Sequence, residues 1–258
     1  MPRKKTSSPS TAPTELPEVN FSDYGDVRYL HLGSPWVQGA MLLDKPFEIE
    51  LEYVQRMMAW LLFSEPDTVA AQHAMQLGLG SAALTKFCHK KLKMKTTAVE
   101  LNPQVVAACR LWFKLPQDDR RLTVIQADAA QEVCKESHCG TVDALQVDLY
   151  DQEAAAPVLD SADFYAHCKD LLTDSGVMTV NLFGRDSSYI NSLEKIGRSF
   201  GTEAVWAFKP TREGNTIVAA QRHASRPDRT ELVQRADAIE SRWGLPANKW
   251  LRLFKPLA

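Results

Sequence analysis

The chain has 258 residues, of which 45% are hydrophobic, and its formal net charge is -2. This length suits one large α/β domain with appendages better than two full domains, and the apolar content is enough for a sizeable core. The small net charge and the absence of an apolar run long enough to span a bilayer give no reason to expect a nucleic-acid or membrane partner.

The start of the chain and its cysteines both indicate a cytoplasmic protein. The first five residues, Met1 to Lys5, lack the apolar stretch of a signal peptide. The five cysteines form no CxxC pair, so free thiols in a reducing compartment are the simplest interpretation. Cys134, His138 and Cys139 lie close together, but their spacing matches no standard zinc site, and no metal is expected.

The first 64 residues are expected to form a tail and a small β-structured element. Residues 1–20 are rich in Ser, Thr, Pro and Lys, which predicts a disordered tail. Two short runs, 27–32 and 36–41, are separated by Gly33-Ser34-Pro35 and predict a β-hairpin. Apolar residues at helical spacing then predict an amphipathic helix over 48–63, so residues 21–64 form one element.

Strands and helices alternate through the following region, which we expect to form a cofactor-binding domain over residues 65–225. The predicted strands are 74–79, 96–100, 122–126, 143–147 and 176–182. The predicted helices are 82–93, 103–114, 129–136, 161–172 and 187–199. This rhythm predicts a mostly parallel sheet with helices on both faces.

The end of this domain predicts two further strands, 204–208 and 215–220. The connection between them has no room for a crossover helix, so the pair is antiparallel. Five parallel strands followed by such a hairpin describe the seven-stranded, Rossmann-like class I methyltransferase fold. Residues 226–258 then form a helix over 229–243, which ends at Gly244-Leu245-Pro246, and an apolar tail that packs on the domain or on a partner subunit.

A glycine turn and a later acid give the strongest functional signal. Gly78, Gly80 and Ser81 follow a predicted strand, and Glu100 ends the next strand, about 20 residues later. Such glycines let the backbone approach a nucleoside closely, and such an acid can accept both ribose hydroxyls. A tight turn without a ligand is the alternative interpretation.

Further acids follow the next two predicted strands. Asp128 and Ala129 come after 122–126, where an acid can accept from an adenine amino group or cap the helix that follows. Asp148, Tyr150 and Asp151 come after 143–147, beside the glycine turn at the switch point of the sheet. Carboxylates there could receive a cationic substrate or remove a proton from an amine, whereas a polar loop with a helix cap is the alternative.

The stretch from about 27 to 222 resembles the spermidine synthase, or polyamine aminopropyltransferase, family. The resemblance is carried by Gly78-Leu79-Gly80-Ser81, Val99-Glu100-Leu101-Asn102-Pro103, Ala127-Asp128-Ala129, and Asp148-Leu149-Tyr150-Asp151 followed by Asp163-Phe164-Tyr165. The first three features are shared with many methyltransferases. The paired aspartates and the amino-terminal hairpin are more specific.

This resemblance implies roles for the residues that match. Gln38, Gly78, Gly80, Ser81, Glu100, Asp128, Ala129 and Asp148 would bind S-adenosylmethionine or its decarboxylated form, with methylthioadenosine as a product. Asp148 would accept the proton of an amine, and Tyr150 or Asp151 would orient that amine. The resemblance also implies a homodimer and a small-molecule amine as the acceptor.

The chain departs from the family pattern at three places. Ser81 replaces the aspartate of the glycine turn, Gln152 replaces a proline, and Val54-Gln55-Arg56 replaces the amine-binding Tyr-His-Glu segment, although Glu52 and Tyr53 could substitute for it. We therefore expect an altered acceptor site in which Arg56 repels a diamine, so that a larger, anionic or peptide-like acceptor is conceivable.

Three functions follow from these patterns. The first is a transferase that moves an aminopropyl or a methyl group from a sulfonium nucleoside. The second is a nucleoside-binding protein without turnover, which the altered acceptor site motivates. The third is a dinucleotide-dependent oxidoreductase, against which the antiparallel terminal hairpin argues.

Overall fold

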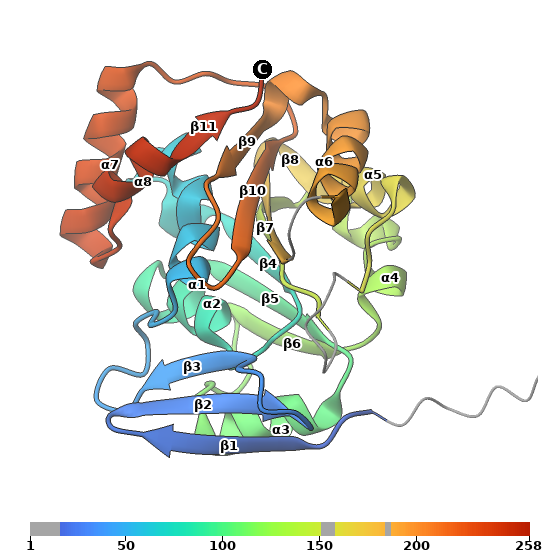
Figure 1. Ribbon diagram of the computed structural model, residues 1–258, viewed down its shortest axis with the longest axis vertical. Helices are drawn as coiled ribbons and strands as arrows, with labels where there is room; N and C mark the ends of the chain where they lie inside the picture. The colour runs from blue at the N-terminus through green and yellow to red at the C-terminus, as the bar shows by residue number, and fades with distance from the viewer. Residues whose placement is uncertain (1–15, 151–157, 184–186) are drawn as a thin grey trace, which may run out of the picture.

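The computed structural model describes residues 16–150, 158–183 and 187–258. In Figure 1 a small three-stranded sheet lies at one end of the molecule, beside a larger sheet flanked by helices. Most of the expected tail, residues 1–15, lies outside the described residues. Its last residues do not fit the expectation, because Val19 and Asn20 already belong to a strand.

The small sheet has the order β1-β2-β3 and is antiparallel throughout. Strands β2 (Val27–Leu32) and β3 (Gly39–Leu42) correspond to the predicted hairpin. Strand β1 (Val19–Tyr24) was not predicted, because nearly all its side chains are exposed and it shows no alternation of buried and exposed positions.

The predicted helix over 48–63 is two shorter elements. An α-helix, α1 (Glu52–Arg56), continues directly as a 3₁₀ helix, η1 (Met57–Phe63). Every side chain from Met57 to Leu62 is buried, so this segment is apolar all round and not amphipathic. The Thr179 hydroxyl of the large sheet donates to the Met57 carbonyl at 2.9 Å and fixes η1 against that sheet.

The large sheet confirms the predicted fold class and adds one strand. Its order is β11-β9-β10-β8-β7-β4-β5-β6, and the five strands from β8 to β6 are parallel. From β4 the chain adds β5 and β6 on one side and then β7 and β8 on the other, so the strand order reverses beside β4. Open α/β sheets bind ligands at such a switch point. The strands are β4 (His73–Leu77), β5 (Lys95–Glu100), β6 (Leu122–Gln126), β7 (Val142–Val147), β8 (Leu172–Phe183), β9 (Val205–Phe208), β10 (Asn215–Gln221) and β11 (Phe254–Pro256).

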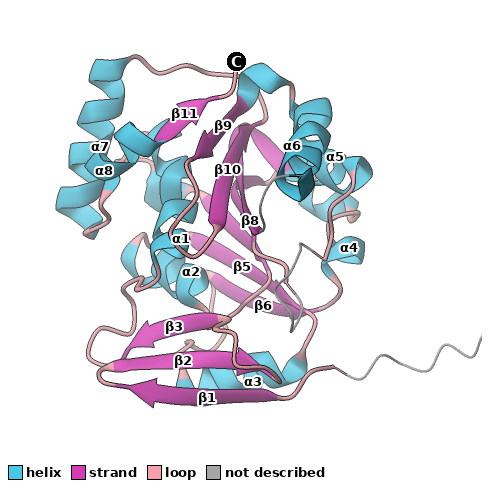
Figure 2. Cartoon of the chain, in the orientation of Figure 1, coloured by secondary structure: helices cyan, strands magenta, loops and turns pink. Residues whose placement is uncertain are grey.

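Helices cover both faces of the large sheet, as Figure 2 shows. On one face η1, α2, α7 and α8 share a core with alternate strand residues such as Ala144, and on the other face α5 and α6 pack on the neighbouring Leu145. No helix among the described residues is long and apolar enough to cross a membrane. The α-helices are α2 (Ala83–Lys86), α3 (Pro103–Trp112), α4 (Ala129–Glu132), α5 (Ala162–Leu171), α6 (Ser187–Phe200), α7 (Arg229–Trp243) and α8 (Ala247–Leu253).

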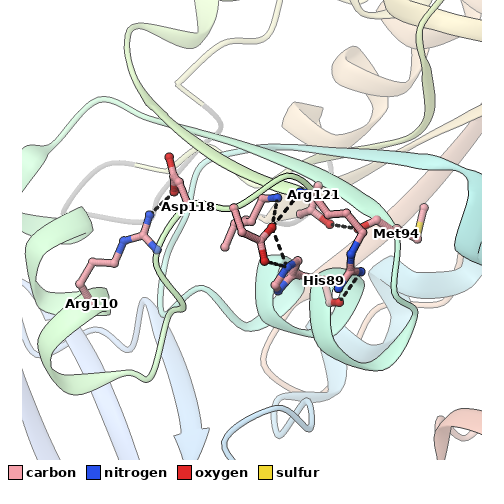
Figure 3. A network of polar contacts seen from close by, with 8 residues as sticks. His89, Met94, Arg110, Asp118 and Arg121 are labelled. Carbon is pink, nitrogen blue, oxygen red and sulfur yellow. Dashed lines mark hydrogen bonds and ion pairs between the residues drawn. The ribbon is translucent and has the colours of Figure 1, made fainter.

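The helix after the glycine turn is fixed by a polar network on the loop that precedes β6 (Figure 3). Helix α2 continues as a π-helix, η3 (Phe87–Lys91), in place of the single helix predicted over 82–93. The buried His89 ring contacts Asp119 at 3.0 Å, and Arg121 donates to the His89 carbonyl at 3.2 Å. Arg110 and Asp118 form an ion pair beside this network. These contacts hold the turn's helix against the loop that precedes β6.

The apolar carboxyl-terminal tail packs on the large sheet. Helix α7 ends at Gly244, whose φ is +74°, and α8 leads into β11, which pairs antiparallel with β9. Phe254 stacks on Phe208 with ring centroids 4.5 Å apart, and Trp250 is buried beside them. The tail therefore covers one end of the domain and takes no part in the wall of the cavity described next.

Candidate functional site

A cavity of about 970 Å³ lies where β4, β5, β7 and β8 end, between the two sheets. It falls at the switch point of the parallel sheet. Trp36 stands in the wall contributed by the loop between β2 and β3, and 58% of its surface is exposed. The predicted site residues in this wall are Gln38, Gly78, Gly80, Glu100, Asp128, Ala129, Asp148 and Tyr150.

The glycine turn needs its glycines because other backbone lies very close. Gly78 has a φ of +88°, and a Cβ there would come within 2.2 Å of the Asp148 carbonyl oxygen. Gly80 has a φ of +50°, and a Cβ there would be 3.0 Å from the Gln38 carbonyl oxygen. The turn is therefore wedged between the loop after β7 and the small sheet, and a side chain at Gly78 would break that fit.

Glu100 links the turn to the start of α3. One carboxylate oxygen accepts from the Leu79 amide at 2.9 Å, and the other accepts from the Asn102 amide at 2.8 Å. Burial raises the pKa of Glu100, and these backbone hydrogen bonds oppose that shift. Asn102 caps α3 by accepting from the Gln104 amide, and Pro103 takes the first helical position, as predicted.

The predictions for Asp128 and Ser81 have different outcomes. Asp128 caps α4 by accepting from the Ala130 amide at 2.8 Å while lining the cavity, so the capping role is confirmed and the ligand role stays a prediction. The expectation for Ser81 does not fit the structure. Its buried hydroxyl donates to the Ala40 carbonyl at 3.0 Å, which fixes the turn to β3, and it lies behind the cavity wall.

Asp148 is held by two side chains from opposite sides. The Asn181 amide donates to Oδ1 at 2.9 Å, and the Tyr53 hydroxyl lies 3.3 Å from Oδ2. Asn181 accepts in turn from the Asn215 amide at 3.1 Å. Enclosure raises the pKa of Asp148, and the hydrogen bonds from Asn181 and Tyr53 counter that rise. A carboxylate with a raised pKa is a stronger base than a solvated one.

The two remaining catalytic predictions concern Tyr150 and Asp151. The Tyr150 hydroxyl donates to the Asn181 carbonyl at 2.8 Å and accepts from the Phe183 amide at 2.6 Å, so its proton is already used by the backbone. Tyr150 therefore braces the end of β8 while it lines the cavity, and its role in orienting an amine stays a prediction. Asp151 lies outside the described residues.

Arg56 does not face the cavity, and the expected repulsion of a diamine by this residue was wrong. Its buried guanidinium pairs with Glu52 at 2.6 Å, donates to the Lys209 carbonyl at 2.6 Å and lies over the Phe208 ring. The helix turns Tyr53 toward Asp148 instead, in agreement with the expectation that Tyr53 could substitute within this segment. The positive charge of Arg56 is therefore buried outside the cavity wall, where it pairs with Glu52.

The cavity wall is acidic. Among its described residues there is no Lys, Arg or His, and six residues carry carboxyl groups: Glu50, Glu52, Glu100, Asp128, Asp148 and Glu213. Across the described ranges, no cluster of three or more His, Cys, Asp or Glu is placed to hold a metal ion. Such a wall favours a ligand that carries positive charge.

Four wall residues with carboxyl or amide side chains were not singled out from the sequence: Glu50, Asn181, Glu213 and Asn215. Asn181 lies near the end of β8, so the rule that singled out acids at strand ends would have found it if it had been applied to amides. Glu213 and Asn215 lie on the turn that enters β10 and reach the cavity only through the order of the strands.

Similarity to curated proteins covers almost the whole chain. No family model matches it. It is 31% identical to the polyamine aminopropyltransferases of Chromobacterium violaceum and Neisseria meningitidis, over 93% and 95% of this chain and 90% and 91% of theirs. It is also 27% identical to the human eEF1A lysine and N-terminal methyltransferase, over 67% of this chain and 26% of that protein.

Solved structures show the same fold. A probable spermidine synthase from Corynebacterium glutamicum superposes with a TM-score of 0.69 at 19% identity, over 97% of this chain and 92% of that one. Human methyltransferase-like protein 13, solved in complex with SAH, superposes with a TM-score of 0.67 at 24% identity, over 76% and 93%. A spermidine synthase in complex with the transition state analogue AdoDATO gives 0.55 at 14% identity, over 88% and 87%.

Proposed function

We propose an activity from one premise: this chain belongs to the polyamine aminopropyltransferase family, a family of transferases. The proposed reaction moves an aminopropyl group from decarboxylated S-adenosylmethionine to an aliphatic amine and leaves methylthioadenosine. The observation that carries this proposal is the charge of the cavity, whose described wall holds six carboxyl groups and no cationic side chain.

This charge distinguishes between the two sulfonium donors. Decarboxylated S-adenosylmethionine has a sulfonium and an ammonium group, both of which acidic residues attract. S-adenosylmethionine has an additional carboxylate, which would meet like charge without a cationic side chain to balance it. Like charges about 4 Å apart cost roughly 1–4 kcal/mol at effective dielectrics between 80 and 20, which is enough to decide the preference.

The nucleoside half of the donor matches the glycine-turn end of the cavity. Gly78 and Gly80 bring the backbone close without side chains, and Glu100 stands at the end of β5, where it can accept from ribose hydroxyls. Asp128 and Ala129 follow β6 and line the cavity, where they would contact the adenine ring. The donor supplies an electrophilic carbon next to its positive sulfur.

Asp148 would take the proton that makes the acceptor nucleophilic. A free alkyl amine has a pKa near ~10.4 and is protonated at neutral pH. Once a proton has passed to Asp148, the nitrogen lone pair forms the new C–N bond, while the C–S bond breaks and its electron pair stays on sulfur. Tyr53 and Asn181 hold the accepting carboxylate in place.

The acceptor end is altered from the family pattern but still suits a cation. Arg56 is turned away and pairs with Glu52, and the carboxyl groups of Glu50 and Glu213 also line the cavity. This arrangement supports an amine with more than one ammonium group, because its distal charges would meet carboxylates. It does not support the anionic acceptor considered from the sequence.

Methyl transfer is the second candidate, because a human methyltransferase shares 27% identity over 190 residues. It requires S-adenosylmethionine as the donor, and therefore a partner for that donor's carboxylate.

Calorimetric titration of the purified protein with S-adenosylmethionine, its decarboxylated form and methylthioadenosine separates these functions. Tighter binding of the decarboxylated form, with methylthioadenosine released when amines are added, is the expected result. A preference for S-adenosylmethionine would replace aminopropyl transfer by methyl transfer. Binding of none of the three would remove the cofactor assignment, and the Glu100→Gln variant serves as the control that places any binding in this cavity.

A further inference from the structure

Asp148 is part of a chain of amides that reaches into the next strand. We infer that Asn181 is a positioning residue that holds the Asp148 carboxylate in its reactive orientation, and that Asn215 sets the orientation of Asn181. This inference rests on the proposed function, because it assigns both amides to the acceptor end of the same site.

The hydrogen-bond directions along this chain leave no freedom. A carboxylate only accepts, so Asn181 must present its Nδ2 to Asp148 Oδ1, at 2.9 Å. Its Oδ1 then faces Asn215, whose Nδ2 donates at 3.1 Å. A flipped Asn181 amide would place oxygen against carboxylate at one contact and donor against donor at the other. Both amides are buried, with 3% of Asn181 and 9% of Asn215 exposed.

The backbone holds both amides in register. Strands β8 and β10 pair so that Asn215 lies opposite Phe183 and Ile217 lies opposite Asn181, which makes the two asparagines diagonal neighbours within side-chain reach. Asn215 is fixed by a turn in which Thr211 and Asn215 exchange hydrogen bonds at 2.8 and 3.2 Å. The Tyr150 hydroxyl braces the other side by bridging Asn181 and Phe183.

These contacts determine which lone pairs of the Asp148 carboxylate remain available to accept a hydrogen bond from a ligand. Asn181 takes one lone pair of Oδ1, and Tyr53 takes one of Oδ2. A carboxylate has about four acceptor positions, so about two are left to receive the acceptor amine. Without Asn181 the carboxylate would lose a donor that favours its ionised form, and it could rotate away from the amine.

The test is the titration of Asp148 itself in the ligand-free protein. Carbon-13 NMR of labelled aspartate follows the carboxyl group, and the signal is assigned by its loss in Asp148→Asn. Asn181→Ala is expected to raise the titration midpoint by about one pH unit, which is tenfold in the protonation constant, and Asn215→Ala by less. An unchanged midpoint in Asn181→Ala overturns the inference.

Two variants keep the test decisive. Thr179→Val removes a buried hydrogen bond to the Met57 carbonyl two residues along the same strand, so it controls for loosening of β8 and should leave the midpoint unchanged. If Asn181→Ala does not fold, the isosteric Asn181→Asp places a second carboxyl group beside Asp148 and should raise the midpoint further. Absence of a shift in that variant also overturns the inference.

Activity then separates this inference from the proposed function. Where the protein transfers aminopropyl groups, the acidic limb of kcat in Asn181→Ala should move up by the same pH interval, with methylthioadenosine binding unchanged. A shifted midpoint in a protein that transfers nothing leaves the inference standing and removes the proposed function. Aminopropyl transfer by the wild type, with no shift of the Asp148 titration midpoint in Asn181→Ala, would keep the proposed function and overturn the inference.

Discussion

The two ends of the cavity are built in different ways. Most of the predicted nucleoside end is made by backbone and by acids at the ends of neighbouring strands, within the 52 residues from Gly78 to Ala129. The acceptor end is made by side chains from four separate segments, Tyr53, Asp148, Asn181 and Asn215, which only the fold brings together. A local motif can therefore indicate the first end, whereas the second depends on topology.

The largest effect should come from the residue that would accept the proton of the amine. Asp148→Asn keeps the shape but removes the base, so kcat should fall roughly 10²- to 10⁴-fold. Methylthioadenosine binding, measured by calorimetry, should change little. Full transfer activity with the true amine would show that Asp148 is not the proton acceptor, and loss of nucleoside binding would show that the two ends are not separable.

Gly78 is where both ends meet, so Gly78→Ala should damage both. A left-handed backbone costs an alanine roughly 1–2 kcal/mol, and its Cβ would collide with the Asp148 carbonyl at 2.2 Å. We expect lower stability in urea denaturation together with weaker nucleoside binding. Gly140→Ala is the matched control, because Gly140 also has a positive φ, +66°, but has open space around it. Equal losses in the two variants would rule out the close approach as the cause.

Glu100→Gln should affect the nucleoside end alone. A neutral amide keeps the size but replaces one charge-assisted acceptor of backbone amides by a donor, at a cost of about 1.5–3 kcal/mol. Methylthioadenosine should bind roughly 10- to 100-fold more weakly, while the KM of the amine stays the same at saturating donor. A change in amine KM without a change in nucleoside binding would contradict this division.

Arg56→Met should lower stability without changing acceptor preference. The variant loses the ion pair with Glu52, the hydrogen bond to the Lys209 carbonyl and the contact with the Phe208 ring, for about 1–2 kcal/mol in urea denaturation. Because the guanidinium points away from the cavity, the KM of the amine should stay within about twofold, a difference of ~0.4 kcal/mol. A much lower KM in the variant would restore the repulsion that the sequence suggested.

The smallest expected effect is a dependence of stability on pH that belongs to neither end. Burial lowers the pKa of both His73 and His89. Their neutral forms are therefore favoured in the folded state, and this contribution is present above the unfolded histidine pKa of ~6.5 and is lost as pH falls through the lower folded values. Urea midpoints should drop between pH 7.5 and 5.5, and less so in His89→Gln. An equal fall of the urea midpoint in the wild type and in His89→Gln would show that His89 does not contribute to this pH dependence.

Local patterns were sufficient for most of the fold. The parallel strands, the terminal hairpin and the helix cap at Asn102 all produce short-range signals, so their positions could be predicted. Strand β1 could not, because exposed side chains give it no alternation, and β11 could not, because three residues are too few for a pattern.

The site shows the same limit more clearly. Gly78, Glu100 and Asp148 were recognisable because each follows a predicted strand. Arg56 was misjudged because a helix residue can face either way, and packing against Phe208 decides which. Asn181 was overlooked because the rule for strand ends was applied to acids and not to amides.

Trp36 is exposed and lies in the cavity wall, so its fluorescence should report on ligand binding. Trp60, Trp206 and Trp250 are buried in the core, so their emission should be shielded from small quenchers, and Trp112 and Trp243 lie outside the cavity wall. Ligand entry should therefore change the acrylamide-accessible part of the fluorescence, and Trp36→Phe should remove that change. Fluorescence titration could then rank candidate amines and nucleosides by affinity before any product is assayed.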